Sequence, residues 1–202
     1  MSLTVVLVIL VPLVLFGWLV TQAMPTPRDR QLSRLRTRAR ALDISVTMVH
    51  VPDPDPDAES RVSSSGQALE PKLELAAYAR GLRLPTGVEK RHVPTWRLLW
   101  MRHHADETLT AGLPPGWRFE RTGLPLLDPV LGRLSELLAR VPKGTVTVEA
   151  TATGCTIAWR ERGDDTDVEA VGAVLDDLVA FQLELARRAA RDDQVGRERR
   201  ES

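Results

Sequence analysis

The sequence predicts an α+β fold: an N-terminal transmembrane helix, then a two-layer domain of antiparallel sheet with helices on one face. Three observations favour this class. The chain opens with an uncharged apolar run, short β-type segments follow, and two amphipathic helical patterns begin at Asp128 and Thr166. We expect about four to six strands, with both helices covering one face of the sheet.

Leu3–Val20 contains eighteen residues without a charge. As a helix it is about 27 Å long, close to the hydrocarbon thickness of a bilayer. A cleaved signal peptide needs a positively charged start, which this chain lacks, although Thr21-Gln22-Ala23 partly fits a cleavage site and leaves processing open. We therefore expect residues 1–23 to be a membrane anchor. No ionisable residue lies within the run, so no transport path is indicated.

Residues 24–43 are predicted to form a basic amphipathic helix beside the membrane, with Thr26 as its N-cap and Pro27 in its first turn. One face carries Leu32, Leu35, Ala39 and Leu42. The arginines on the remaining faces are Arg30, Arg34, Arg36, Arg38 and Arg40. These arginines predict an N-terminus outside the cell and a cytoplasmic domain. They either contact anionic lipid headgroups or serve only as the topology signal while the leucine face packs on the domain.

The composition bounds the rest of the chain. Lysine plus arginine and aspartate plus glutamate each number 27, so the net charge is zero and no nucleic-acid partner is expected. A single cysteine excludes an internal disulfide. Residues 44–190 have the length of one soluble α+β domain.

The first half of this domain should be mainly strands and loops. Ile44–Val51 alternates like a strand, whereas residues 52–68 are rich in Pro, Asp and Ser and predict a flexible loop. Leu69–Leu84 fits a short helix and a strand equally well. Trp96–Arg102 predicts a strand that places Trp96 and Trp100 on one face, where they either pack in the core or line a groove.

The second half is more regular. Trp117–Glu120 predicts a short strand, and Asp128-Pro129 opens a helix by side-chain capping. Thr145–Thr151 and Cys155–Arg162 predict a hairpin that turns at Thr153-Gly154. The predicted partners are Ala152 with Cys155, Ala150 with Ile157 and Val148 with Trp159. A Thr166–Glu169 capping box then opens the longest amphipathic helix, and residues 191–202 predict a disordered tail. The apolar stripe of this helix is Val168, Val171, Val174, Leu175, Leu178, Phe181 and Leu185.

No stretch predicts a catalytic, cofactor-binding or metal site. Asp53, Asp55 and Asp57 have calcium-loop spacing, but prolines between them and Ala58 at the required glycine position do not fit. His103-His104-Ala105-Asp106-Glu107 predicts a polar turn. Cys155 is expected to be a small core residue. An enzyme with a site assembled from distant residues such as His50, His103, His104 and Asp106 is kept as a third hypothesis.

The chain contains, in order, an N-terminal span, an arginine-rich helix, one extended segment, Gly112-Leu113-Pro114-Pro115-Gly116-Trp117 and a hairpin-plus-helix ending. It resembles uncharacterised single-pass inner-membrane proteins of proteobacteria, some of them labelled YajC-like. YajC is a small accessory subunit of the Sec translocase. This chain is longer than YajC-type proteins and lacks their Gly-Asp and Gly-Gly-rich β segment, so the resemblance transfers no functional residue.

The sequence therefore predicts a non-catalytic accessory or protein-interaction module at the cytoplasmic face of a bacterial inner membrane. Its expected partners are the bilayer, through Leu3–Val20, and an unidentified membrane or cytoplasmic protein; no cofactor is expected. The alternative is an anionic-lipid-binding module that uses the arginine helix and the Trp96/Trp100 surface.

Overall fold

The computed structural model describes residues 18, 26–54, 56, 67, 71–101 and 112–201. The chain divides into two compact units, Met1–Arg34 and Leu35–Ser202. In the described part, no helix has both the length and the apolar composition that crossing a membrane requires. Leu3–Val20 lies outside that part except for Trp18, and so do most of the 52–68 loop and the His103–Glu107 segment.

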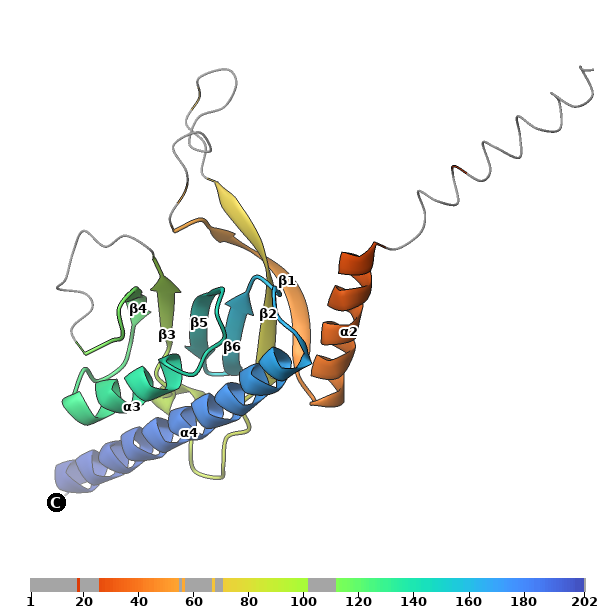
Figure 1. Cartoon of the computed structure of the whole chain (residues 1–202). Coiled ribbons are helices and arrows are strands. Elements are labelled where there is room, and N and C mark those ends of the chain that lie inside the picture. Colours follow the sequence, from red (N-terminus) through yellow and green to blue (C-terminus); the bar gives the residue numbers. More distant parts are fainter. Residues whose placement is uncertain are drawn as a thin grey trace, which may run out of the picture. The chain divides into compact units, whose positions relative to one another are not determined.

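The larger unit is an α+β domain built on one six-stranded antiparallel sheet, as the alternating segments predict (Figure 1). The strand order is β1-β2-β6-β5-β3-β4. The strands are β1 (Ser45–Pro52), β2 (Lys72–Gly81), β3 (Trp96–Trp100), β4 (Trp117–Thr122), β5 (Thr145–Thr151) and β6 (Gly154–Trp159). Within the ambiguous Leu69–Leu84 segment, Lys72–Gly81 is thus a strand, which pairs with β1 on one side and β6 on the other. Its buried side chains lie on both faces of the sheet.

Two helices cover one face of this sheet, α3 (Asp128–Leu138) and α4 (Asp165–Glu201), and Figure 1 shows them side by side. A short 3-10 helix, η2 (Lys90–His92), precedes β3. Helix α2 (Pro27–Ala41) begins as predicted, because Thr26 Oγ1 accepts a hydrogen bond of 3.2 Å from the Asp29 amide. Its residues Leu35 and Ala39 are buried in the core of the larger unit, so the leucine face packs on the domain.

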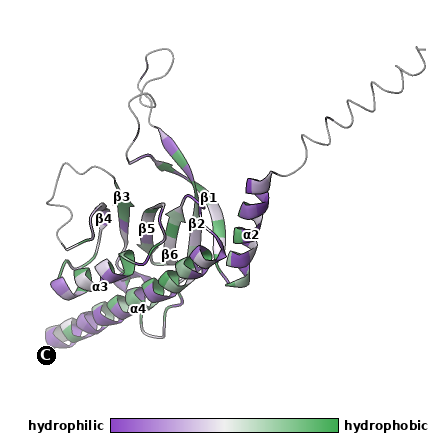
Figure 2. Cartoon of the chain, in the orientation of Figure 1, coloured by the Kyte–Doolittle hydropathy of each residue, from purple (hydrophilic) through white to green (hydrophobic). Residues whose placement is uncertain are grey.

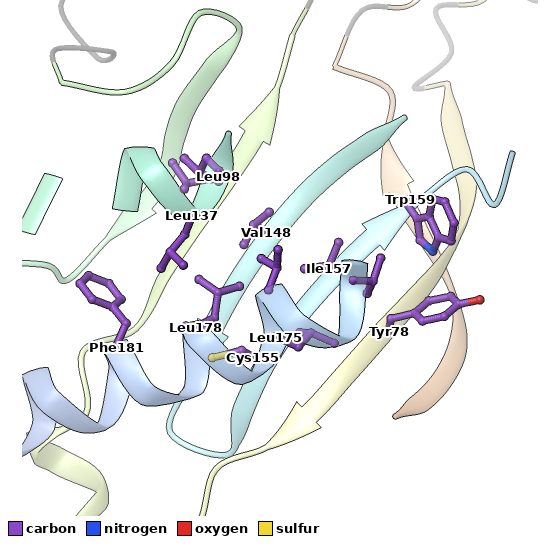
Figure 3. Packing of buried hydrophobic residues seen from close by; sticks show 14 of the residues in the cluster. Tyr78, Leu98, Leu137, Val148, Cys155, Ile157, Trp159, Leu175, Leu178 and Phe181 are labelled. Atoms are coloured by element: carbon purple, nitrogen blue, oxygen red, sulfur yellow. The ribbon is translucent and has the colours of Figure 1, made fainter. Parts of the chain in front are cut away.

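The main core lies between the sheet and these helices. Figure 3 shows Leu175 and Leu178 of α4 beneath Val148 and Ile157 of the sheet, whereas Phe181 lies farther along α4, near Leu137 of α3. All seven apolar residues predicted for the α4 stripe are buried: Val168, Val171, Val174, Leu175, Leu178, Phe181 and Leu185. The helical spacing therefore predicted this interface correctly, since residues three and four apart share one face.

The opposite face of the sheet carries a second apolar cluster. Its buried members are Val51, Leu75, Ala77, Leu99, Val146 and Ala158. Val146 belongs to it because the β5–β6 register shifts between Thr145 and Thr147 and leaves Val146 as an extra residue. The sheet thus has apolar side chains on both faces along its central strands.

The hairpin of β5 and β6 forms, but its predicted register is wrong. The turn lies one residue earlier, at Ala152-Thr153, and Ala150 pairs with Cys155 while Val148 pairs with Ile157. The partners therefore shift by two residues, which keeps Val148, Ala150, Cys155, Ile157 and Trp159 on their predicted face. Position 154 of β6 needs glycine, because the backbone of β2 passes too close for a side chain there.

Both predicted helix starts need correction. Leu127, not Asp128, is the N-cap residue of α3, and no side chain caps it. At α4 the cap lies two residues before Thr166: Asp164 Oδ1 accepts a hydrogen bond of 2.9 Å from the Thr166 amide, and Asp167 Oδ2 accepts one of 3.0 Å from the Asp164 amide. Aspartate caps a helix at least as well as threonine, so Asp164 takes the N-cap position.

Helix α4 also continues to Glu201, through the segment predicted to be a disordered tail. This end is strongly hydrophilic in Figure 2 and its side chains are mostly exposed. Arg197 and Asp193 pair at 3.2 Å across one helical turn. The helix therefore extends without a buried face beyond Ala186, the last residue that it buries in the core.

Candidate functional site

The domain contains a pocket of about 1210 Å³ at one end of the sheet. Four parts of the chain form its walls: the ends of the β1–β2 pair, the ends of β3 and β4, the turn from α3 to β5, and the segment from β6 into α4. The lining residues are Asp53, Pro54, Leu73, Trp100, Trp117, Leu138, Arg140, Val141, Pro142, Lys143, Gly144, Thr145, Val146, Arg160, Arg162, Gly163, Asp167 and Ala170.

The charged lining of this pocket is mainly basic. Arg140 is paired with Asp177 at 2.6 Å, whereas no carboxylate among the described residues pairs with Lys143, Arg160 or Arg162. All three of these side chains belong to exposed residues. Asp167 also lines the pocket, but its Oδ2 accepts a hydrogen bond from the Asp164 amide at the start of α4. The pocket therefore presents unpaired cations to whatever enters it.

Trp100 forms an aromatic part of the wall and is 38% exposed. Its position depends on Gly116, which has a φ of 91° in the turn before β4. A Cβ atom on Gly116 would lie 2.5 Å from the indole Nε1 of Trp100, so only glycine fits beneath the ring. The Gly112–Trp117 turn thus leaves the space that the Trp100 ring occupies.

Trp96 lies elsewhere. It is 0% exposed, and its indole Nε1 donates a hydrogen bond of 3.0 Å to Oε1 of the buried Gln182 in α4. The side-chain amide of Gln182 also donates to the carbonyl of Pro94. The structure therefore separates the two tryptophans of the predicted groove, placing Trp96 in the helix-covered core and Trp100 at the pocket.

The arginines of α2 have different environments. Arg36 binds Glu161 in two places, with Nη2 2.7 Å from Oε2 and Nε 3.2 Å from Oε1. Arg38 is paired with Glu169 of α4. Arg30, Arg34 and Arg40 are exposed. Two of the five candidate lipid-contact residues thus bind carboxylates of the domain itself.

Glu161 lies between the pocket cations Arg160 and Arg162 but points to the interior, where it is 7% exposed. The Tyr78 hydroxyl donates to its Oε1 over 2.9 Å. The pKa of Tyr78 is raised far above its ordinary value, mainly by burial and also by this hydrogen bond to Glu161. The bond to Glu161 raises the pKa of Arg36 as well. Glu161 has a φ of 40°, a left-handed conformation that is unusual for glutamate.

Neither Glu161 nor the pocket cations stand out in the sequence as site residues. Arg160 and Arg162 directly follow a predicted strand, which is where loop residues with a binding role are often found. That signal is weak, because it does not show that Lys143, a short way before the hairpin, reaches the same pocket. Only the folded hairpin brings these residues together.

The described residues offer little for metal or nucleophilic chemistry. Within them, no group of three His, Cys, Asp or Glu side chains is placed to hold a metal ion. Cys155 is fully buried, as expected of a core residue, and burial raises the pKa of its thiol to about 12. His50 is exposed on β1, and the other members of the enzyme hypothesis, His103, His104 and Asp106, lie outside the described residues.

No protein-family model matches this chain, and no curated protein or solved structure matches it significantly. The fold class and the pocket are therefore the basis for the functional argument: an antiparallel α+β domain with a large, basic and partly apolar concavity.

Proposed function

We propose that this chain is a non-catalytic accessory protein of a bacterial inner membrane, anchored by Leu3–Val20, whose cytoplasmic domain binds a partner protein. The pocket carries this proposal. Its volume of about 1210 Å³ exceeds the roughly 300–1,000 Å³ of ordinary small-molecule sites and suits a segment of another protein. Its mixture of an exposed tryptophan and unpaired cations resembles the composition of protein interfaces, which are enriched in aromatic residues and arginine.

The chain length between anchor and domain supports a role close to the bilayer. The first residue of the larger unit, Leu35, follows Val20 by only fifteen residues. The arginines after the span favour a cytoplasmic domain. A partner bound at the pocket would therefore be held near the inner surface of the membrane.

Affinity purification of the full chain from its own membranes in mild detergent tests the proposal. We expect a specific protein to co-purify with the wild type and to be lost from the Arg160→Glu/Arg162→Glu variant. A matched control is Arg187→Glu/Arg191→Glu, which reverses two exposed cations of α4 that do not line the pocket. Recovery of this chain alone under several growth conditions would contradict the proposal.

A second function, binding of anionic lipid, is favoured by the exposed Arg30, Arg34 and Arg40 of α2. Flotation of residues 25–202 with vesicles should then require anionic lipid and weaken with salt. It should also weaken in the Arg30→Gln/Arg34→Gln/Arg40→Gln variant. Replacing Arg36 instead would disturb the ion pair with Glu161, so Arg36 is not suitable for this test.

A further inference from the structure

We infer that the pocket recognises a carboxylate-rich, partly apolar segment of its partner. This inference rests on the proposed function and adds the chemistry of the bound segment. Four cationic side chains line the pocket against two carboxylates, and one of those carboxylates, Asp167, caps α4. Charge complementarity therefore calls for an anionic ligand.

The unpaired cations come from two segments that the backbone holds together. Lys143 lies in the turn before β5, while Arg160 and Arg162 follow β6. The Arg160 amide donates a hydrogen bond of 3.2 Å to the carbonyl of Gly144, the residue after Lys143. Gly144 has a φ of 89°, and a Cβ there would lie 3.8 Å from that of Arg160. Lys143 and Arg160 therefore extend from neighbouring backbone positions of the same wall, and their charges add to one positive potential that favours an acidic ligand.

The uncharged part of the wall indicates what else the ligand carries. Leu73, Val141 and Trp100 line the same pocket, and Trp100 keeps more than a third of its surface accessible. An exposed indole beside arginines fits a segment that alternates acidic and apolar side chains. A flat bilayer surface fits this arrangement less well, because the cations line a concavity whose walls come from several elements.

The test uses the full chain in nanodiscs of neutral lipid and a fluorescent peptide that alternates glutamate and leucine. Fluorescence anisotropy should show binding that weakens as salt is added. The Arg160→Glu/Arg162→Glu variant should lose about tenfold or more in affinity, because each substitution replaces an attraction with a repulsion. Lys143→Glu should lose less, and Arg187→Glu/Arg191→Glu should bind as the wild type does.

Lys143→Glu matters because it leaves both neighbours of Glu161 unchanged, so its effect does not depend on the Arg36–Glu161 pair. Circular dichroism of each variant checks the fold. A peptide with glutamine at each glutamate is the second control. Equal binding of that peptide, or indifference to all pocket variants, would overturn the inference.

Competition with phosphatidylglycerol vesicles tests whether the pocket binds anionic lipid instead of an acidic peptide segment. If they displace the peptide from the wild type, and bind less well to Arg160→Glu/Arg162→Glu, the pocket recognises lipid and the inference is overturned. The two proposals fail separately. A co-purified partner without peptide binding overturns only the acidic-segment inference, whereas peptide binding without any co-purified protein counts against the proposed function.

Discussion

Glu161 joins three parts of the domain through one carboxylate. It accepts hydrogen bonds from Arg36 at the start of the folded unit and from Tyr78 in β2, while its own neighbours line the pocket. The Glu161 side chain is 5% exposed and that of Arg36 is 32% exposed, so the pair is largely shielded from solvent. A buried charge that loses its partner is costly, which makes this pair sensitive to substitution.

Glu161→Gln should lower the free energy of unfolding by about 2–3 kcal/mol, because Arg36 loses its counter-charge in a partly buried position. Urea unfolding followed by circular dichroism measures this change. The matched control is Glu169→Gln, which removes the exposed pair with Arg38 and should change stability by less than about 1 kcal/mol. Equal effects of the two substitutions would contradict this account of Glu161.

Tyr78 allows a direct test of the same network, because it is the one tyrosine in the chain. As the pH is raised, the near-ultraviolet absorbance of tyrosinate should appear only at a pH well above the ordinary tyrosine pKa of about 10. Glu161→Gln should lower that pKa, since the Glu161 carboxylate disfavours a second negative charge beside it. Titration of the folded protein at an ordinary pKa would contradict the burial of this hydroxyl.

The same pKa shift links Tyr78 to stability. The folded state holds the phenol proton more tightly than the unfolded state, so this stabilisation is fully present below a pH of about 10. It is lost progressively as the pH rises above that value. Tyr78→Phe should lower the free energy of unfolding at neutral pH, because the hydrogen bond to Glu161 is lost. The variant should then lose less stability than the wild type as the pH rises above about 10.

At the scale of the elements, the close approach of β6 to β2 requires a glycine at the start of β6. Gly81 of β2 pairs with Gly154 of β6, and a Cβ on Gly154 would lie 2.4 Å from the carbonyl oxygen of Arg80. A backbone atom cannot move aside as a flexible side chain can. Position 154 therefore needs glycine, and the turn at Ala152-Thr153 is the one that places Gly154 there.

Gly154→Ala should destabilise the domain by about 1–3 kcal/mol, the range for adding a methyl group to a fully occupied space. Gly132→Ala is the control, because Gly132 lies in α3 with no atom within 4 Å of the added Cβ. That change should stabilise the domain by up to about 1 kcal/mol through helix propensity. Thermal unfolding of both variants decides the matter, and a neutral Gly154→Ala would show that the strands lie farther apart.

Across the larger unit, stability should come mainly from the layer between the sheet and α3 and α4. Helix α4 is 37 residues long, yet its buried residues end at Leu185 and Ala186. Beyond them, Asp193 pairs with Arg91 at 3.3 Å and with Arg197 on α4 itself. These exposed pairs contribute little to stability.

A variant that keeps the N-terminus but ends after Gln194 should therefore have a melting temperature within about 2 °C of that of the wild type. A chain ended after Glu184 loses Leu185 and Ala186 and should melt about 5–10 °C lower, since a buried leucine contributes a few kcal/mol. Circular dichroism melts in detergent compare the two chains. A large fall in the melting temperature of the chain that ends after Gln194 would show that the exposed end of α4 makes stabilising contacts.

The sequence alone predicted the features that depend on local periodicity. Helical spacing identified the buried stripe of α4, and alternation identified β1, β3 and the faces of the β5–β6 hairpin. Both patterns report which side of an element is apolar, so they predicted the α+β class and the layer of helices correctly. They could not separate helix from strand in Leu69–Leu84, whose apolar residues satisfy both periods.

The tertiary structure decided whatever depends on residues distant in sequence. A shift of two residues leaves every side chain on its face, so no burial pattern could distinguish the true pairing of Ala150 with Cys155 from the predicted one. The pairing of Arg36 with Glu161 spans 125 residues, and the pocket joins turns from four parts of the chain. Such contacts arise because strands that are distant in sequence become neighbours in the sheet, which local composition does not encode.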